Sequence, residues 1–575
     1  MRSARRPLFH VFLVSPSKYD DDGFVIRHWR GVLPSNTLAC LYGLTEDVRR
    51  KGLLGAVDLR IHLLDEAVTR IPIEKIVRLS RRSGVRVAVG LVGVQTNQFC
   101  RAADIALSLR QRGVTVLMGG FHVSGVLALF PDGSPEIRQL VDAGVCVVAG
   151  EVDDRWADLL RDVYEGKLQP IYSFLDELPD LSHAPGPLIH RQYLRKFVCS
   201  NFGTLDCSRG CPFNCSFCTV ITVQGRKSRY RSPECIVETL RRNYLESGAT
   251  FCFFTDDNFA RNPVWEQVFD RLIQFREQEG VPFEFMIQAD VGASKIPGFV
   301  EKAAHAGCTS VFIGVESLNA SNLRDAGKTQ NKVSEYKDLL DIWRQARVST
   351  HVSYMIGFPF DTEESVREDI ERLVRELRPD KASFFMMTPI PGSRAHKAMV
   401  DAGLPLDADY NTYDSFHECM PHPRMKNGAW TRAFYQAWHR YYSFDNMRDI
   451  LSRAHSGNYW AIFRNCYWSR NSLLNEGAHP MVAGFFPLKD RRTRRPGFQL
   501  EGRLAHWRRR VPEICRYVRN AFRIVLEMEE LWLETSEGRA IRLRATRRDA
   551  KGFWAGLREV RLASAFLIAF ATGRG

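Results

Sequence analysis

The stretch Cys207–Cys218, CSRGCPFNCSFC, places four cysteines within twelve residues, beside one proline and two phenylalanines. Three kinds of structure gather cysteines this tightly: a disulfide knot, a zinc site or an iron–sulfur cluster. Fourteen cysteines in 575 residues are too few for a disulfide scaffold, and a reducing cytosol would not maintain one. The other ten are scattered singly, which is typical of small buried hydrophobes. A disulfide knot is therefore the weakest of the three explanations.

The spacing of the four cysteines favours a cluster over zinc. Structural zinc usually takes two CxxC-like pairs, whereas only Cys215 and Cys218 form one here and no second pair lies nearby. A CxxxCxxC set of thiolates holds three irons of a [4Fe–4S] cluster and leaves the fourth open to another ligand. Cys211, Cys215 and Cys218 fit this register, while a start at Cys207 would need a cysteine where Asn214 stands. Zinc, or structural cysteines without a metal, remain the alternatives.

The residues before the cysteines alternate between strand-like and helical patterns. A helical stripe over 99–109 ends near Gly113, and such strand–helix repetition predicts a doubly wound sheet whose ligands bind beyond the carboxyl ends of the strands. Three loops fall at those ends: 96–99, 119–125 and 149–151. The predicted strands are apolar or alternating runs: Leu8–Ser15, Val57–Leu63, Val85–Val94, Val114–Gly120 and Val145–Glu151.

A second βα series follows the cysteines, and the short apolar segment 197–208 before them is expected to contain its first strand. About 200 residues suit a partial βα barrel, with polar residues at the strand ends forming a site at its mouth. Helical patterns separate the predicted later strands, which are Thr250–Asp256, Phe283–Asp290, Ser310–Ser317, Ser349–Gly357 and Ala382–Pro389.

Length and composition predict several domains. We expect a first domain over 1–172, a proline-containing linker over 173–198, a second domain over 199–400, and a basic, helical C-terminal region over 401–575 that covers the substrate. The formal net charge is +14. Solvated helix faces are the simplest explanation of the late arginine clusters, and an anionic membrane surface, nucleic acid or an acidic partner are the alternatives.

No run approaches the roughly 20 apolar residues that cross a bilayer. The last apolar run, 562–570, is about half that length, and the N-terminal one alternates and lacks a cleavage site. A cytoplasmic protein is expected.

With both βα series in place, the chain resembles the radical S-adenosylmethionine enzymes that carry an N-terminal cobalamin-binding domain. The motif RGCPFNCSFC (209–218) carries the resemblance, which covers roughly residues 8–400. It implies an α/β protein with a Rossmann-like, doubly wound cobalamin-binding-type domain, a central partial TIM-like barrel and a mainly helical C-terminal region. It also implies that Cys211, Cys215 and Cys218 hold a [4Fe–4S] cluster whose open iron binds the methionyl group of S-adenosylmethionine.

The resemblance implies further S-adenosylmethionine contacts, with Phe217 beside the adenine. The segment TDDNF (255–259) replaces the Gly-Gly-Glu-like stretch of many members, so a helix cap is its alternative role. The Gly-x-Pro element at 357–359 would border the adenine, or form a plain turn capped by Asp361 or Thr362. The implied contacts are Phe217, Asp256, Asp257, Asn258, Gln288, Asp290, Glu316, Ser317, Gly357 and Pro359. Cys207 is expected to be a buried inert thiol, with a catalytic thiol as the alternative.

The cobalamin contacts implied by the first domain lie in its three strand-end loops. The Asp-x-His-x-x-Gly signature of cobalt ligation is absent, which implies cobalamin without a protein histidine on cobalt, or a domain that only covers the substrate. His62 is interpreted as structural, and His122 as lining the cofactor tail or capping a turn. The candidate residues are Thr96, Asn97, Gly119, Gly120, His122, Ser124, Gly150 and Glu151.

Together these features predict a radical enzyme, most simply a methyltransferase acting on an unactivated carbon. A cobalamin-dependent cyclisation or rearrangement is the alternative within this chemistry, and a non-catalytic cobalamin- or redox-sensing module is the alternative outside it. The expected partners are a small-molecule or lipid-like substrate and an electron donor such as flavodoxin or ferredoxin. Peripheral membrane contact is compatible with the basic C-terminal region, and nucleic acid is not expected.

Overall fold

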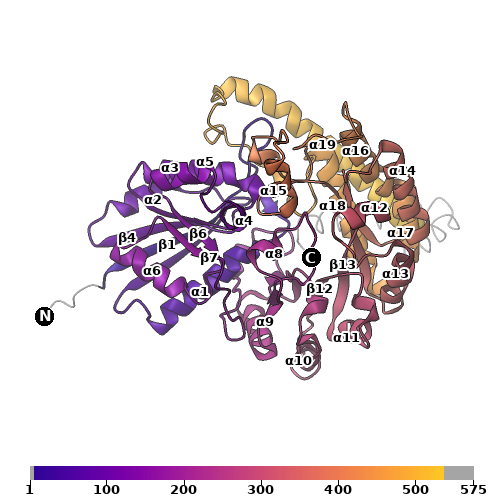
Figure 1. The fold of residues 1–575 in the computed structure, drawn as a ribbon, viewed down its shortest axis with the longest axis horizontal. Coiled ribbons are helices and arrows are strands. Elements are labelled where there is room, and N and C mark those ends of the chain that lie inside the picture. The colour runs from indigo at the N-terminus through magenta and orange to yellow at the C-terminus, as the bar shows by residue number, and fades with distance from the viewer. Residues whose placement is uncertain (1–5, 536–575) are drawn as a thin grey trace, which may run out of the picture.

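Two six-stranded parallel sheets organise the chain in the computed structural model, which describes residues 6–535 (Figure 1). The first sheet has the order β3-β1-β4-β5-β6-β7, and all of its neighbouring strands run parallel. The predicted doubly wound sheet is therefore confirmed. Its strands are β1 (Leu8–Ser15), β3 (Asp58–Asp65), β4 (Val85–Leu91), β5 (Thr115–Gly119), β6 (Cys146–Gly150) and β7 (Ile171–Phe174).

Helices cover both faces of the first sheet, and each face has its own apolar core. One core includes side chains of α1 (Asn36–Lys51) and α6 (Trp156–Glu165). The other includes side chains of α2 (Ile73–Ser80), α3 (Phe99–Arg110), α4 (Phe121–Leu129) and α5 (Pro135–Asp142).

Strand β7 was not foreseen, and it extends the sheet past the boundary predicted at residue 172. The segment expected as a linker contains α7 (Arg191–Leu194) and the buried residues Leu181, Ile189 and Phe197.

The second sheet has the order β15-β14-β13-β12-β11-β8, so that consecutive strands lie side by side and form the predicted partial barrel. Its strands are β8 (Phe202–Leu205), β11 (Phe251–Phe254), β12 (Glu284–Ala289), β13 (Cys308–Glu316), β14 (Ser349–Ile356) and β15 (Lys381–Met386). The helices between them are α9 (Pro233–Ser247), α10 (Trp265–Glu277), α11 (Phe299–Ala306), α12 (Ala320–Asp325), α13 (Tyr336–Gln345) and α14 (Glu363–Arg372). Short elements near the cysteines are β9 (Ser208–Arg209), α8 (Val220–Val223) and β10 (Arg229–Tyr230).

The C-terminal region is mainly helical, as expected, and the largest core cluster continues into it. It contains α15 (Arg394–Asp401), α16 (Ala429–Tyr441), α17 (Phe444–Arg453), α18 (Ser456–Asn475) and the long α19 (Arg503–Glu534). One strand in it was missed by sequence: β16 (Gly484–Pro487) pairs antiparallel with β2 (His28–Gly31) of the first domain. The C-terminal region is thereby joined to both halves of the molecule. One of the late arginine clusters, at 542–548, and the apolar run at 562–570 lie outside the described residues.

Local sequence signals fix the ends of the helices around the site. Ser35 caps α1 by accepting a hydrogen bond from the Leu38 N–H, and Gly52 ends that helix in the left-handed conformation. Helix α4 corrects the sequence prediction, because residues 121–125 were expected in a loop. None of the described helices combines the length and apolarity that a bilayer span requires.

Candidate functional site

The cysteine loop follows the first strand of the barrel at its carboxyl end. Gly210 turns the chain into the loop with φ of 94°, and an added Cβ there would lie 2.5 Å from the Lys227 carbonyl oxygen, so only glycine fits. Cys211 and Cys218 are partly exposed and Cys215 is buried, and all three thiols are free. Burial raises the pKa of the Cys218 thiol to about 12, and Asp257 and the other two thiols act in the same direction.

This donor set fits a cluster better than a single ion. Three soft thiolate donors come from one loop, as a [4Fe–4S] cluster with one open iron requires. No three His, Cys, Asp or Glu side chains within residues 6–535 converge closely enough to hold one metal ion. Each thiolate of a cubane binds a different iron, so its ligands stand further apart than those of zinc.

Cys207 is separate from this set. Its side chain is fully buried in the core of the barrel domain. Burial, with Asp256 next in size, raises the pKa of the Cys207 thiol well above its usual value. Its backbone N–H donates to Asp256 Oδ2 at 2.9 Å, and its carbonyl accepts from the Arg231 N–H. These contacts agree with the inert thiol expected from sequence and disfavour a catalytic one.

The two aspartates of TDDNF hold the base of the cysteine loop. Asp256 accepts from the Cys207 N–H and from the Ser208 hydroxyl at 2.5 Å, and burial raises its pKa to about 7. Asp257 accepts from the Gly210 N–H at 3.4 Å, and burial raises its pKa to about 6. Neither side chain caps a helix through these bonds, so the capping alternative is wrong for both.

Residues at the carboxyl end of β12 contact the other side of the cysteine loop. Asn258 and Asp290 exchange hydrogen bonds, and Asp290 binds Arg261 through two bonds of 2.7 Å. The Arg261 guanidinium lies 5.5 Å from the centre of the Phe213 ring, between Cys211 and Cys215 in sequence. Gln288 donates to the Asp256 carbonyl at 3.1 Å. These predicted ligand contacts therefore form a framework that orients the cysteine loop.

Glu316 is the strained residue of the site. It ends β13 with φ of 65°, a left-handed conformation that is rare outside glycine and concentrates at functional positions. Its carboxylate accepts from Lys328 Nζ and from the Ser353 hydroxyl, each at 2.8 Å. Lys328 Nζ also lies 5.8 Å from the Phe217 ring centre, so the charged pair borders the cysteine loop. Sequence reasoning missed Lys328, whose only signal is its place in the turn after α12.

Ser317 and the turn at Gly357 make structural contacts within the protein. The Ser317 hydroxyl is buried and accepts from the Asn319 N–H at 3.0 Å, so it supports the turn before α12. Asp361 accepts from the N–H groups of Gly357 and Phe358, which is the capped-turn alternative. At Gly357, with φ of 113°, an added Cβ would lie 2.1 Å from the Trp430 ring.

The same turn still borders the cysteine loop. The Phe358 ring lies 6.2 Å from the Phe217 ring, edge to face, so an adenine beside Phe217 would also meet this turn. Pro359, the third residue of the Gly-x-Pro element, is exposed.

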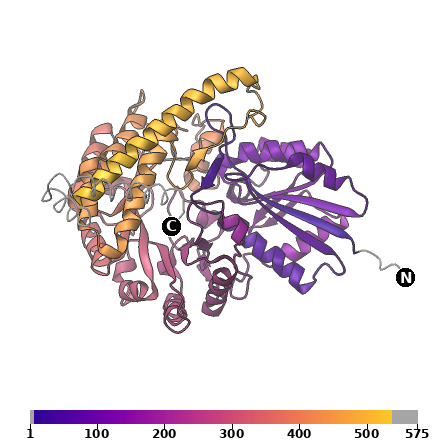
Figure 2. The same ribbon diagram turned by 180° about the vertical axis from the view of Figure 1, so that it is seen from behind.

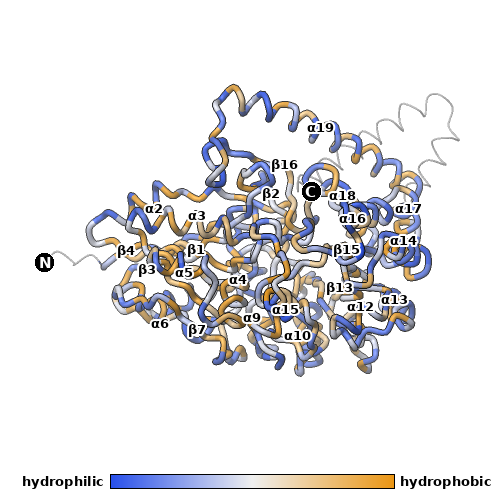
Figure 3. The backbone as a smooth tube through the Cα atoms, turned by 45° about the horizontal axis from the view of Figure 1, so that its top comes forward, coloured by the Kyte–Doolittle hydropathy of each residue, from blue (hydrophilic) through white to orange (hydrophobic). Residues whose placement is uncertain are grey.

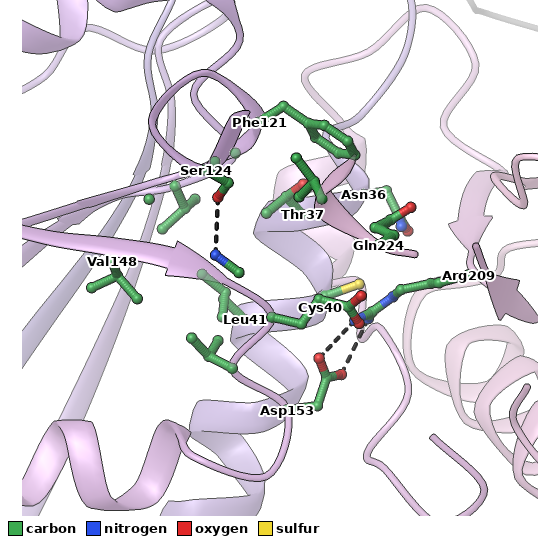
Figure 4. Close-up of a pocket in the computed structure, with 18 of the residues that line it drawn as sticks. Asn36, Thr37, Cys40, Leu41, Phe121, Ser124, Val148, Asp153, Arg209 and Gln224 are labelled. Atoms are coloured by element: carbon green, nitrogen blue, oxygen red, sulfur yellow. Dashed lines mark hydrogen bonds and ion pairs between the residues drawn. The ribbon is translucent and has the colours of Figure 1, made fainter. Parts of the chain in front are cut away.

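A cavity of about 310 Å³ lies where the first sheet meets the base of the cysteine loop (Figure 4). Its inner wall is apolar and includes Leu41, Leu117, Val148 and Trp156. One wall contains five residues predicted for cobalamin, Gly119, Gly120, Ser124, Gly150 and Glu151, and the other contains Asp206, Ser208, Arg209, Thr255 and Asp257 of the barrel domain. The predicted ligand face of the doubly wound sheet and the base of the cysteine loop therefore line one cavity.

One polar atom in the cavity wall has no partner. Asn36 donates from Nδ2 to Thr255 Oγ1 at 3.0 Å, but its Oδ1 atom is buried and accepts no hydrogen bond from the described residues. Buried acceptors are normally satisfied. A ligand with amide donors at its rim, lying on an apolar inner wall, fits this cavity.

A network of buried ion pairs, called the seam below, joins the two walls of the cavity. Glu151 is its one member that the sequence analysis had predicted as a site residue. Arg209 binds Glu151 at 2.7 Å, Asp153 at 2.6 Å and Asp206 at 2.8 Å, with only 11% of its side chain exposed. Arg229 adds a bond to Glu151, and Arg231 adds one to Asp206. The only sequence signal is the position of Arg209 at the start of the cysteine motif.

Three predicted cobalamin contacts lie outside this cavity. The His122 ring is enclosed between Phe99, at 4.1 Å, and Tyr410, at 4.8 Å, and burial lowers its pKa to about 3. Its Nδ1 atom lies 3.3 Å from Thr96 Oγ1, so Thr96 supports the same contact. Neither these two residues nor Asn97 lines the cavity.

The structure gives Gly120, a predicted cobalamin contact, a reason for being glycine that lies within the protein. At Gly120 an added Cβ would lie 2.1 Å from the Val94 nitrogen, so close approach of two protein loops requires glycine there. His62 is structural, as expected, because its ring bonds His10 at 2.8 Å and stacks on Phe12.

Comparison with known proteins agrees with this geometry. The family model of the radical SAM superfamily matches residues 205–373. Bacteriochlorophyllide d C-8(2)-methyltransferase of Chlorobaculum tepidum is 26% identical over 348 residues, covering 57% of this chain and 72% of its own length. Hopanoid C-2 methylase of Rhodopseudomonas palustris is 27% identical over 239 residues, covering 41% of this chain and 42% of its own.

Among solved structures, the radical S-adenosylmethionine methyltransferase TsrM of Kitasatospora setae, with cobalamin and a [4Fe–4S] cluster bound, has a similar fold. Its TM-score is 0.57 at 15% identity, and the match covers 80% of this chain and 99% of that one.

Proposed function

The chain is a member of the radical S-adenosylmethionine superfamily, and on this premise we propose that it transfers a methyl group, by way of cobalamin, to an unactivated carbon of a large apolar substrate. Membership implies a [4Fe–4S] cluster on Cys211, Cys215 and Cys218, with S-adenosylmethionine at the open iron. When bound, these groups supply reductive cleavage of S-adenosylmethionine, and cobalamin supplies a transferable methyl group.

The shared cavity carries the proposal. Asp257 lines that cavity and also accepts from the Gly210 N–H, one residue before the first cluster cysteine. A corrin on the apolar inner wall would therefore lie beside the radical centre. Its amide rim offers the donors that Asn36 Oδ1 lacks. No histidine within residues 6–535 lines the cavity, which is compatible with cobalamin bound without a protein histidine on cobalt.

The chain's own residues position the two reactive groups. Arg261 and Asp290 hold the cysteine loop from one side, and Asp256 holds it from below. Lys328 offers a cation beside the loop that can bind the methionyl carboxylate, while Glu316 keeps that cation in place. Phe217 and Phe358 offer an aromatic corner for the adenine. In this arrangement the polypeptide binds and orients, and the cofactors supply the chemistry.

The inner face of the barrel supports an apolar substrate. One apolar residue on each of five neighbouring strands is partly exposed, while the residues on either side of it along the strand are buried. Strand registers place them on one face, since Phe253 pairs with Met286 and Met355 with Phe385. The five are Phe253, Met286, Phe312, Met355 and Phe385.

A group of hydrogen-bonded polar side chains lies at one end of this inner face of the barrel. The hydroxyl of Ser383 bonds His351 at 2.8 Å and His479 at 3.0 Å, and the His479 ring stacks on Phe385. A wide apolar wall with one polar end suits a polycyclic or lipid-like molecule. The names of the bacteriochlorophyllide and hopanoid relatives indicate substrates of that kind.

The decisive experiment follows a labelled methyl group. Protein reconstituted anaerobically with iron, sulfide and cobalamin is given a low-potential reductant, such as reduced flavodoxin, S-adenosylmethionine with a CD3 group, and an apolar extract of the source cells. The proposal expects 5′-deoxyadenosine together with an extract component that has gained CD3. Deoxyadenosine with an unlabelled rearranged product would assign cyclisation or rearrangement instead. Intact S-adenosylmethionine would favour the sensing module and refute the proposal.

Substitutions within the motif provide the matched control. Cys211→Ala removes one cluster ligand and should abolish both iron binding and cleavage, whereas Cys207→Ala should keep both because that thiol lies in the core. Leu117→Trp fills the apolar wall of the cavity and should lose cobalamin while keeping the cluster. Equal iron loss in Cys207→Ala and Cys211→Ala would contradict the three-ligand assignment.

A further inference from the structure

Helix α19 presents a continuous apolar stripe to solvent. Its members recur three, four or seven residues apart, and the exposed Cys515 falls within the longest gap. The stripe runs for about 33 Å at 1.5 Å per residue. Its residues and exposed fractions are Leu504 85%, Trp507 56%, Val511 50%, Val518 56%, Phe522 64% and Leu526 49%. Isolated exposed apolar residues are common, but a patch of this length marks an interaction surface.

The opposite side of the helix fixes this orientation. Tyr517, Ile524, Met528 and Leu531 are buried, and the helix packs against α17 and α18. The stripe therefore cannot turn inward without breaking the core contacts of α19. Figure 2 shows the helix lying along the outside of the molecule for its whole length, and Figure 3 shows hydrophobic and hydrophilic residues alternating along it.

A row of arginines borders the stripe on one side. With 3.6 residues per turn, the apolar residues occupy an arc of about 100°, and Arg508, Arg516, Arg519 and Arg523 occupy the next 80° or so. All four are exposed, and none has an acidic partner among the described residues. The neighbouring Arg509, by contrast, is paired with Glu501 and Glu513.

We propose that α19 docks flat on the surface of an anionic lipid bilayer, with its apolar stripe in the interface and its arginine row on the lipid phosphates. Charge complementarity selects this occupant. A membrane surface supplies apolar depth and negative charge along the same line, which matches a helix with Trp and Phe on one side and arginines beside them.

A second copy of the chain fits less well. It would bring the same unpaired arginines together in a protein whose net charge is already +14. The sequence beyond the described residues, 536–575, remains basic, with nine Lys or Arg against three Asp or Glu.

Vesicle flotation of the full-length protein tests this docking. Vesicles of phosphatidylcholine and phosphatidylglycerol in equal parts should carry the protein, and vesicles of phosphatidylcholine alone should not. Each arginine near an anionic surface contributes about fivefold in affinity, so R508Q/R519Q/R523Q should weaken binding by about 100-fold. Raising the salt concentration should weaken it in the same way.

Matched variants separate the stripe from general surface effects. W507Q/F522Q should abolish binding, whereas Leu245→Gln, at a single apolar residue that is 74% exposed on α9, should not. R78Q/R81Q/R82Q removes three exposed arginines around α2 and is the charge control. All variants change exposed side chains, and an unchanged cluster spectrum checks their fold.

Three results would overturn the proposal. The first is equal binding of the wild type to both kinds of vesicle. The second is a loss in W507Q/F522Q no greater than that in Leu245→Gln. The third is a dimer in analytical ultracentrifugation that W507Q/F522Q dissociates, without vesicle binding, which would assign the stripe to a second copy of the chain.

Discussion

Replacing Arg209 by methionine tests the seam that holds the two walls of the cavity together. The side chain of Arg209 binds three carboxylates, Glu151, Asp153 and Asp206, whose side chains are at most 7% exposed. Methionine keeps much of the apolar stem and removes the charge. Since breaking a buried ion pair by removing one partner costs about 3–5 kcal/mol, Arg209→Met should lower the free energy of unfolding substantially.

The ion pairs that remain in Arg209→Met decide where in the range of about 3–5 kcal/mol the loss of stability falls. Arg229 still binds Glu151, and Arg231 still binds Asp206. Asp153 alone loses its near partner, because its remaining contact with Arg231 is 3.7 Å long. One uncompensated buried carboxylate places the loss at the lower end, about 3 kcal/mol. Asp153→Asn in the same protein removes that charge and should restore about 1 kcal/mol or more.

The loss should also depend on pH. A buried carboxylate without a partner has a raised pKa, so it destabilises the folded state most when it is ionised. The difference between wild type and Arg209→Met should therefore narrow as the pH falls from 8 towards 5. In the wild type, burial raises the pKa of Asp206, but Arg209 and Arg231 together lower it far below its usual value.

The assay is anaerobic urea unfolding followed by tryptophan fluorescence. Arg161→Met is the matched control, because Arg161 pairs with Asp158 on the surface, where the two side chains are 44% and 68% exposed. Exposed pairs of this kind contribute about 0.5 kcal/mol or less. If Arg209→Met costs no more than Arg161→Met, or if Asp153→Asn restores nothing, the seam does not hold the walls together.

Two further predictions concern other contacts between the regions. Gly125→Val should lower the free energy of unfolding by about 1–3 kcal/mol in the same urea assay, because an added Cβ would lie 2.6 Å from the Pro391 carbonyl oxygen. Gly457→Ala is the control and should change it by less than about 1 kcal/mol, because no atom would lie nearer to its Cβ than 3.4 Å. The His417 ring donates hydrogen bonds to the carboxylates of Asp21 and Asp414, which raises its pKa to about 9, so the stabilisation from these bonds is complete below about pH 6.5 and is lost as the pH rises through 9. Because the His417 side chain is 37% exposed, solvent weakens this effect, and the free energy of unfolding of the wild type should fall by about 1 kcal/mol more than that of His417→Gln between those pH values. Equal falls in the two proteins would refute the role given to His417.

The strands were predictable because their sequence pattern reflects burial directly. Val85–Val94 and Val145–Glu151 read as apolar runs, and their strands are buried on both sides of a parallel sheet. Helix α4 was missed for the opposite reason. Its residues other than the buried His122 and Ser124 are apolar or glycine, since it lies between the first sheet and the barrel domain, with Gly125 against Pro391. A helix without a polar face has no period for sequence reasoning to detect.

The candidate site was predictable only where one short segment contains it. Three cysteines within eight residues define the cluster by spacing alone. Arg209 and Glu151 are 58 residues apart, so neither sequence position predicts their contact. Lys328 follows Glu316 by twelve residues across a strand end and a short helix. Both pairs are products of tertiary structure, and no periodic pattern encodes them.

The cavity between the domains depends on contacts from three separate regions. Arg209 joins its walls from the barrel side, Gly125 of α4 lies against Gly392 after β15, and β16 of the C-terminal region pairs with β2 of the first domain. A single substitution breaks only one of these contacts, because the other two still hold the domains in register. Cobalamin affinity should therefore fall modestly in Arg209→Met or Gly125→Val and much more in the double variant. An additive effect of the two substitutions on cobalamin affinity would mean that the contacts act independently and do not cooperate in holding the walls together.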